Sequence, residues 1–449
     1  MCVKLKKRFI LKENIVSTPS NKFSPNRCQV ILIFDGIWPA ETTVRSFRFL
    51  NSIFRLFNLT ILVLLTLIMS ADAIANINEI SLITDNLCFL IGCFETLAKG
   101  FKCCIEYKNI KKLINDIYEP IDIIKKKNNV EIMKWITEIA DFENRQFFTV
   151  FGMVILLASA RIFSADIKNR EFPVRIFVPF DASEPPYYHL MYVAISYGIL
   201  IVNYSLFGVD IMVIVIMRYL TVQLEILKAN CRHCRSDPIK RAINLSSDQN
   251  SKLFERSAIT NALIDSDNNE DIELKEFVMF EVQEKNVYDE DTFDWRFKHC
   301  VTQHQKIINM LNVVNNCFSF CAVVQITTST ILVCLNGFQI LLSYGNLYLL
   351  IRRILAIIVF LFKLFVWCWY GNKMSAAAES LTSNLWMCGW ENEHKHGIRN
   401  TVSIPMILSL RSLELRAVGV VPLSLQTFVS ALKTSYSVLV LLLTVAKDQ

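Results

Sequence analysis

An uncharged stretch of 45 residues, Ile307–Ile351, does most to limit how this chain can fold. A helix needs roughly 20 predominantly apolar residues to cross a bilayer, so the stretch is about twice as long as one crossing requires. It is interrupted at Ser343-Tyr344-Gly345-Asn346, a combination typical of turns. We therefore predict two membrane spans here: a fifth that ends before Ser343 and a sixth over Leu347–Tyr370.

Composition extends this prediction to the whole chain. Of its 449 residues 53% are hydrophobic and 20% charged, and the mean hydropathy is +0.36. Soluble domains carry more charge and fewer large apolar residues. We predict an all-α, polytopic membrane protein with seven transmembrane helices. The remaining spans are expected at Leu56–Ala75, Ile80–Cys104, Gln146–Phe163, His189–Met217 and Ser424–Ala446.

These spans divide the chain into five segments. The flanks of the long fourth-to-fifth loop have helical spacing, so we expect them to extend both spans into the cytoplasm. Thr401–Leu410 is interpreted as the first half of a broken final helix, interrupted near Gly419 and Pro422. The segments are a cytoplasmic N-terminal segment (1–55), transmembrane helices 1–4 (56–220) with a proline-rich outer loop (164–188), a long cytoplasmic loop with an acidic insert (221–306), transmembrane helices 5 and 6 (307–372), and a cytoplasmic loop with the broken seventh helix (373–449).

Basic residues indicate the orientation. Cytoplasmic loops carry an excess of Lys and Arg, and the segment through Arg55 holds 10 of them. The loops after the second and fourth spans are also basic, whereas the opposite loops and the C-terminal tail are poor in Lys and Arg. The N-terminus is therefore predicted to be cytoplasmic and the C-terminus extracellular. The first span would act as an uncleaved signal-anchor, since no apolar signal sequence precedes it.

The 14 cysteines do not suggest a disulfide framework, because the loops assigned to the outside contain none. Cys231-Arg232-His233-Cys234 offers zinc-type ligands, but a four-ligand site needs a second cluster, and only the irregularly spaced His299, Cys300 and His304 are candidates. We therefore interpret the cysteines as free cytosolic thiols and not as zinc ligands. His394 and His396 are assigned to a solvated loop in the same way.

Enzyme signatures are missing from the sequence. It has no glycine-rich phosphate loop, no nucleophile elbow and no paired-carboxylate arrangement. We therefore expect no enzyme activity, no catalytic residue, no metal and no cofactor. Neither the net charge of +6 nor its distribution points to nucleic acid.

Ionisable residues inside spans are costly and invite a functional hypothesis. Asp210 and Lys363 lie within the fourth and sixth spans, toward the cytoplasmic half, and a structural role is favoured for both over ion conduction. Lys433 differs because it lies in the final helix among hydroxyl residues, where it can face water.

The final span carries hydroxyl groups at helical spacing. Residues three or four apart share one face of a helix. Such a face is either a close-packing interface of small residues or a pore wall that narrows at apolar side chains. The sequence leaves both open, and a symmetric assembly permits both. The residues on this face are Thr427, Ser430, Thr434, Ser437, Leu441 and Thr444.

Several motifs together resemble the insect odorant receptor family. The strongest is Leu423-Ser424-Leu425-Gln426-Thr427-Phe428 followed by Leu432-Lys433-Thr434-Ser435-Tyr436-Ser437, which resembles the family's C-terminal signature. Weaker matches occur in family order, and the resemblance covers roughly 33–445. They are Gly36-Ile37-Trp38-Pro39, Val178-Pro179-Phe180-Asp181, Pro186-Tyr187-Tyr188, Gln223-Leu224-Glu225-Ile226-Leu227, His304, Trp386 and Trp390.

The resemblance implies an odorant-gated, non-selective cation channel. Family members of the ligand-tuning type, which the last helix resembles more than the co-receptor, assemble with a shared odorant co-receptor into heteromeric tetramers. They reside in the plasma membrane of olfactory neuron dendrites, and the last helix of each subunit lines the pore. Carried over from Phe428, the family's pore and gate positions fall on Thr434, Ser437, Leu441, Thr444 and Val445.

The same resemblance places the odorant pocket in the outer half of the middle spans. A largely apolar pocket with one or two hydroxyl groups suits a small volatile ligand. The candidate ligand-binding residues are Phe89, Leu156, Ser159, Phe163, Tyr192, Ser196 and Phe338.

Three alternative functions remain on the sequence alone: a gustatory-type receptor, a G-protein-coupled receptor and a transporter. A gustatory-type receptor of the same architecture would form channels without the co-receptor. A G-protein-coupled receptor would have an extracellular N-terminus, and the sequence lacks Asp-Arg-Tyr after the third span. A transporter would need coupling-ion sites, and no internal repeat is visible.

Overall fold

The computed structural model describes residues 45–76, 80–126, parts of 141–163, 170–176, 187–234, 277, 293–342, 347–392, 397–410 and 413–447. Helices dominate these regions, and the described β-structure is one short hairpin. The elements are α3 (Arg45–Ala75), α4 (Ile80–Ile105), α5 (Tyr107–Lys126), α7 (Tyr187–Arg232), α10 (Phe293–Leu342), α11 (Leu347–Trp386), η2 (Trp390–Asn392), α12 (Ile398–Ser409), β1 (Arg416–Ala417), β2 (Val421–Pro422) and α13 (Leu425–Lys447).

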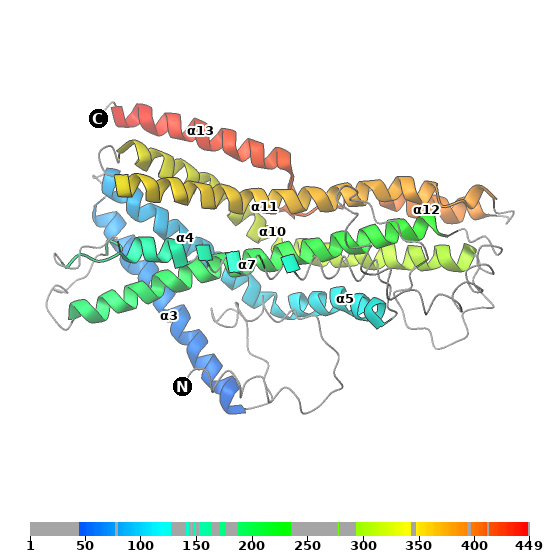
Figure 1. The fold of residues 1–449 in the computed structure, drawn as a ribbon, viewed down its shortest axis with the longest axis horizontal. Coiled ribbons are helices and arrows are strands. Elements are labelled where there is room, and N and C mark those ends of the chain that lie inside the picture. Colours follow the sequence, from blue (N-terminus) through cyan, green and yellow to red (C-terminus); the bar gives the residue numbers. More distant parts are fainter. Residues whose placement is uncertain are drawn as a thin grey trace, which may run out of the picture.

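Three helices run along most of the molecule. α7 has 46 residues, α10 has 50 and α11 has 40. At 1.5 Å per residue their lengths are about 69, 75 and 60 Å, roughly twice the bilayer core or more. In Figure 1 they lie side by side, with α4 and α13 beside one half and α5 and α12 beside the other. The predicted helical extensions of the fourth and fifth spans are thus present, and α11 extends the sixth span in the same way.

The predicted break of the long uncharged stretch is confirmed. α10 ends at Leu342 and α11 begins at Leu347, so the stretch forms two separate helices. α3 and α4 are likewise separate helices at the first two predicted spans. For the third span, only part of the backbone is described; it includes a helical stretch from 155 to 162.

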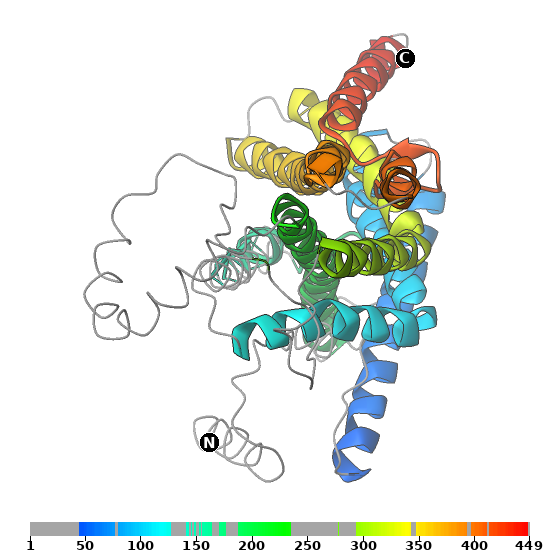
Figure 2. The same ribbon diagram turned by 90° about the vertical axis from the view of Figure 1, so that its right-hand side faces the viewer.

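The fold class is that of an all-α, polytopic membrane protein. Four described helices are long and apolar enough to cross a membrane: α3, α7, α10 and α13. α7 lies at the centre and is buried along most of its length, whereas α13 lies at the edge of the bundle (Figure 2). The side of the membrane on which each terminus lies stays a prediction.

Buried side chains form two main clusters. The larger cluster joins α5 to the second half of α7, the first half of α10 and the second half of α11. We call it the inner core. The smaller joins α3, α4 and the first half of α7, and we call it the outer core. Phe172 and Val174, from the described part of the proline-rich loop, also pack into the outer core. The described part of this loop thus packs against the helices that form the outer core.

The broken final helix consists of α12, a β-hairpin and α13. Val418 and Gly419 have positive φ at the hairpin turn, where glycine adopts this conformation at no steric cost. Asn315 of α10 holds the hairpin, since its side chain donates to the carbonyl of Glu414 and accepts from the N–H of Arg416. The interruption predicted near Gly419 and Pro422 is therefore confirmed.

Gly371 of α11 allows the segment before α13 to approach closely. A Cβ atom added at this glycine would clash with the carbonyl oxygen of Leu423 and lie 2.8 Å from its Cβ. We expect Gly371→Ala to displace Leu423 and destabilise the protein by about 1–3 kcal/mol, the usual cost of overpacking. Thermal unfolding of the purified protein in detergent would measure the change.

Gly92 of α4 provides the matched control. A Cβ added there would meet the nearest side chain, Leu206, at an ordinary contact distance of 3.7 Å. Gly92→Ala should therefore leave the unfolding temperature near that of the parent protein, or raise it. Equal destabilisation by both alanine variants would contradict the close approach at Gly371.

Candidate functional site

A buried network of four charged side chains lies where four helices meet. Glu95 and Lys99, one turn apart on α4, form an ion pair of 2.7 Å. Lys99 Nζ also lies 2.7 Å from Asp210 Oδ1 of α7. Lys363 Nζ of α11 lies 2.6 Å from Glu95 Oε1 and 3.1 Å from Asp210 Oδ2. The two lysines and two carboxylates therefore form a closed, electrically neutral ring of contacts, which we call the charge network.

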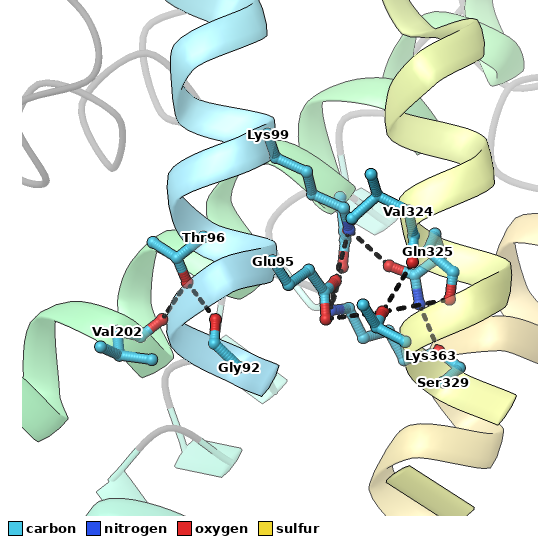
Figure 3. Close-up of polar contacts among 11 residues, drawn as sticks. Gly92, Glu95, Thr96, Lys99, Val202, Val324, Gln325, Ser329 and Lys363 are labelled. Atoms are coloured by element: carbon cyan, nitrogen blue, oxygen red, sulfur yellow. Dashed lines mark hydrogen bonds and ion pairs between the residues drawn. The ribbon is translucent and has the colours of Figure 1, made fainter. Parts of the chain in front are cut away.

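α10 completes the coordination of the charge network with neutral polar groups. Lys99 Nζ donates to Gln325 Oε1 at 2.5 Å, and the Thr328 hydroxyl donates to Glu95 Oε2 at 2.9 Å (Figure 3). The Gln325 amide in turn donates to the Ser329 hydroxyl at 2.7 Å. Lys99 and Glu95 thus have neutral hydrogen-bond partners on α10 in addition to their ionic ones, which reduces the cost of burying their charges.

Water is almost excluded from this network. The side chains of its four charged members are at most 4% exposed. A buried ion pair with good geometry adds little net stability, but removal of one partner costs about 3–5 kcal/mol because it leaves an uncompensated charge. The arrangement therefore fixes how the four helices sit relative to one another.

The structural role predicted for Asp210 and Lys363 fits these contacts. Each is paired with the other and with α4, so neither is a lone charge facing lipid. Their partners on α4, Glu95 and Lys99, were not predicted from the sequence. Their i, i+4 spacing was the available signal, because residues so spaced are neighbours on a helix.

A second group of charges lies nearer the predicted outer side. Asp85 of α4 accepts two hydrogen bonds from Arg161, at 3.2 and 3.1 Å. Arg352 and Arg353, at the start of α11, also contact the Asp85 carboxylate. Tyr348 donates its hydroxyl to the carbonyl of Ala160 at 2.5 Å. These contacts fasten the third span to α4 and α11.

Four of the seven predicted ligand-binding residues lie inside the outer half of the bundle. Phe89 packs against the outer core, and Phe338 is buried on α10. Tyr192 donates its hydroxyl to the carbonyl of Ile162 at 3.1 Å, so α7 contacts the third span there. The Ser196 hydroxyl is buried and has no hydrogen-bond partner within the described residues.

The other three predicted ligand-binding residues lie on the third span and are less enclosed. Leu156 is 49% exposed and Phe163 80% exposed. The Ser159 hydroxyl donates to the carbonyl of Leu156, its own helix, at 3.0 Å. Whether this set holds a ligand stays a prediction.

One side of α13 packs against the rest of the chain. The hydroxyl of Ser435 donates to the carbonyl of Thr330 of α10 at 3.1 Å. Ala431 is buried against Leu364 and Cys368 of α11. These contacts hold α13 at the edge of the bundle.

The opposite side of α13 is open to the surroundings of this single chain. It carries Ser430, Thr434, Ser437, Leu441 and Thr444, all exposed, and Leu441 is 62% exposed. Each hydroxyl donates to a carbonyl of its own helix at 2.8–3.0 Å, so none depends on this chain's other helices.

The remaining predicted residues of α13 behave differently. Thr427, predicted on the same face, is partly buried and donates to the carbonyl of Pro422 at 2.6 Å. Lys433 is exposed beside the hydroxyl face. The side chain of Val445 lies outside the described residues.

Cys231, Cys234 and Cys300 are free thiols. Cys234 Sγ lies 3.8 Å from Cys300 Sγ, and both are buried. Hydrogen bonds with Cys231 and Cys234, together with burial, raise the pKa of Cys300 well above its usual value, so its thiol stays protonated. Within the described residues no group of three or more His, Cys, Asp or Glu side chains has the arrangement of a metal site. The interpretation as free thiols agrees with these observations.

His304 lies in the first half of α10 and is 2% exposed. Its Nε2 atom has no hydrogen-bond partner within the described residues. Burial lowers the pKa of His304 to about 4, because water no longer stabilises the charged imidazolium. The side chain is therefore neutral near pH 7.

Comparison with known proteins places this arrangement in a family. The sequence model described as "7tm Odorant receptor" matches residues 79–436. Odorant receptor 13a of Drosophila melanogaster is 22% identical over 398 residues, which cover 84% of each chain. Odorant receptor 83a of the same organism is 22% identical over 298 residues, which cover 61% of each chain.

Solved structures agree on the fold. The insect olfactory receptor OR5 from Machilis hrabei superimposes with a TM-score of 0.70 at 13% identity, over 98% of this chain and 99% of that one. The structure of the same receptor in complex with eugenol has a TM-score of 0.68 at 13% identity, over 93% and 97% of the two chains. At such low identity the likeness shows the fold alone, and the family follows from the sequence match over most of the chain: this protein belongs to the 7tm odorant receptor family.

Proposed function

We propose that this protein is a ligand-tuning odorant receptor, a subunit of an odorant-gated, non-selective cation channel in the plasma membrane of olfactory neurons. The observation that carries the proposal is the division of α13 into a packed side and an open, hydroxyl-bearing side. A helix that faces only lipid has no need of four hydroxyl groups on one side. In an assembly, the open sides of several copies of α13 would surround a water-filled path.

Within this path, Leu441, Thr444 and Val445 would form the gate. Leu441 places an apolar side chain among hydroxyl groups, and an apolar constriction can close a pore by excluding water. Thr434 and Ser437 would line the wider part. Ligand binding would open the pore only if the ligand binds the open arrangement more tightly than the closed one.

The partner in this proposal is the odorant co-receptor, within a heteromeric tetramer. The end of the molecule distant from the outer core exposes large apolar side chains, which is typical of surfaces that pack against other subunits. They come from the end of α11, from α12 and from the hairpin. They are Trp386, Met387, Ile404, Ile407, Leu410, Val418 and Val420, each between 56% and 77% exposed.

The odorant would bind in the outer half of the bundle, among the apolar residues predicted for the pocket. Eugenol, the ligand in the Machilis receptor complex, is of a size and apolarity that such a site would suit. Ser196 is the proposed polar contact, since its buried hydroxyl lacks a partner within the described residues. A small apolar pocket with one hydroxyl would select volatile molecules that carry a single polar group.

We expect Ser196→Ala to raise the odorant concentration for half-maximal current about tenfold, the loss of one hydrogen bond. Ser159→Ala is the control, because that hydroxyl is already bonded to its own helix and should affect affinity less. An equal shift in both variants, or none in Ser196→Ala, would contradict the assignment of Ser196.

The proposed function itself is tested by expressing the chain with and without the co-receptor and applying an odorant panel. Odorant-evoked cation currents only with the co-receptor are the expected result. Currents from the chain alone would favour a gustatory-type channel. An epitope tag after Gln449 should be accessible on intact cells, since the C-terminus is proposed to be extracellular. A tag accessible only after permeabilisation would reject the orientation and the pore side assigned to α13.

A further inference from the structure

The charge network adjoins the outer core, in which the proposed odorant site lies. Lys363 Nζ lies 5.9 Å from the centre of the Phe207 ring, and Phe207 belongs to the outer core. Val359, one turn before Lys363 on α11, belongs to the same core. A change in the packing of the outer core would therefore change the contacts of the part of α11 that carries Lys363.

The next residues of α11 contact α13. Leu364 and Cys368 pack against Ala431. The Phe365 ring meets the Phe428 ring edge-on at 5.5 Å between centroids. The stretch of α11 from Lys363 to Cys368 thus contacts two partners. Lys363 pairs with Glu95 and Asp210, and the residues that follow it pack against the proposed pore helix.

α10 has the same two-sided arrangement. Thr328 and Ser329 belong to the polar surroundings of the charge network, and the carbonyl of the next residue, Thr330, accepts the hydrogen bond from Ser435 of α13. Further along, the side chain of Leu439 fits against Gly337, where an added Cβ would lie 3.3 Å away. The pore helix therefore rests on two helices whose relative position the charge network fixes.

From these contacts we infer that Lys363 is a positioning residue for gating: its pairing with Glu95 holds α11, and through it α13, in the closed arrangement. The inference rests on the proposed function, since it concerns the gating of that channel. Opening would require α11 to move relative to α4, which lengthens the Lys363–Glu95 contact. Weakening this contact should therefore favour the open arrangement without any ligand.

A charge-neutral double variant tests the inference. Glu95→Gln/Lys363→Met removes the α4–α11 pair and leaves Lys99 paired with Asp210. Lys99→Met/Asp210→Asn removes the same number of charges but keeps the Glu95–Lys363 pair. Glu225→Gln/Lys228→Met is the control outside the network, since this pair lies within one helix, α7.

Two measurements report on the position of α13 without an odorant. The first is the basal current of each variant with the co-receptor, divided by the amount of protein at the cell surface. The second is the rate at which a cationic methanethiosulfonate reagent modifies Thr434→Cys introduced into each variant, with the same chain lacking this cysteine as background. We expect both to rise at least fivefold in Glu95→Gln/Lys363→Met, to change less in Lys99→Met/Asp210→Asn, and to stay constant in Glu225→Gln/Lys228→Met.

If the charge network only stabilised the fold, the two measurements would give a different result. It would lower the surface amount of both network variants similarly and leave the normalised basal current and the modification rate unchanged. That result would overturn the inference, and so would equal effects of the two network variants. If the parent receptor carries no odorant-evoked current, the proposed function fails, whereas a responsive parent with unchanged variants rejects only the role of Lys363.

A milder pair of variants covers the case in which the double variants do not reach the surface. Thr328→Val removes the hydroxyl that donates to Glu95 and nearly preserves the side-chain shape. Thr302→Val, on the same helix, removes an exposed hydroxyl bonded to its own helix. A basal current raised at least twofold in Thr328→Val and not in Thr302→Val supports the inference, and equal currents in both reject it.

Discussion

Replacement of Leu441 by alanine should raise the basal current of the channel several-fold when the chain is expressed with the co-receptor. Leu441 interrupts the hydroxyl face of α13 with a large apolar side chain that is 62% exposed on the single chain. An apolar constriction stays closed because water leaves it, and a shorter side chain both widens it and reduces its apolar surface. Patch-clamp recording without odorant, normalised to surface protein, measures the effect.

Leu443 provides the control for this experiment. It lies two residues after Leu441 on the same helix, is partly buried, and points about 160° away from Leu441 around the helix axis. Leu443→Ala makes the same truncation and should leave the basal current unchanged, because this side of α13 does not carry the hydroxyl groups. Unchanged basal and odorant-evoked currents in Leu441→Ala would reject Leu441 as the gate.

The positions of the spans could be predicted because each depends on local sequence. An uncharged stretch too long for one crossing must turn, and Ser343-Tyr344-Gly345-Asn346 was the one strong turn signal within it. The start of α13 at Leu425 follows in the same way from Pro422 and the hydroxyl of Ser424. Ser424 accepts a hydrogen bond from the N–H of Thr427, as a helix-capping residue does.

The length of the helices was harder to predict than their existence. Apolar content marks the part of a helix inside the bilayer, but α11 continues to Trp386 beyond the expected end of its span. Its continuation is rich in Ala and Ser and packs on α12 and on the inner core. Helix propensity and tertiary packing decide such a boundary, and hydropathy does not report them.

The charge network could be predicted only in part because its contacts are distant in sequence. Lys99 and Asp210 are separated by 111 residues, and Glu95 and Lys363 by 268. Asp210 and Lys363 attracted attention as charges within spans, and the structural role favoured for them is the one these contacts support. Their partners on α4, Lys99 and Glu95, were harder to find, because these charges lower the apolar character of that span.

The odorant pocket, too, could not be derived fully from the sequence. Its candidate residues came from a resemblance and from apolar character, and neither determines which side of a helix turns inward. Phe338 is buried on α10, whereas Phe163 on the third span is 80% exposed in the single chain. Residues of one chemical type thus occupy very different surroundings, and only the packing of several helices separates them.

Lys99→Met should strongly destabilise the protein. Lys99 contacts Glu95, Asp210 and Gln325 and is 1% exposed. Its removal leaves two buried carboxylates that share Lys363, and an uncompensated buried charge costs about 3–5 kcal/mol. Since whole domains are stable by only about 5–15 kcal/mol, we expect most of the protein to be lost from the cell surface.

The double variant Lys99→Met/Asp210→Asn separates loss of charge balance from loss of contacts. It removes one further ionic contact but restores neutrality, with Glu95 and Lys363 still paired. If the charge balance dominates, the double variant will be more stable than Lys99→Met although it has fewer ion pairs. Surface labelling and the unfolding temperature in detergent give the comparison. A double variant as unstable as the single one, or less stable, would mean that the network stabilises the fold by its individual contacts, and the neutrality of the four charges would then have no energetic role.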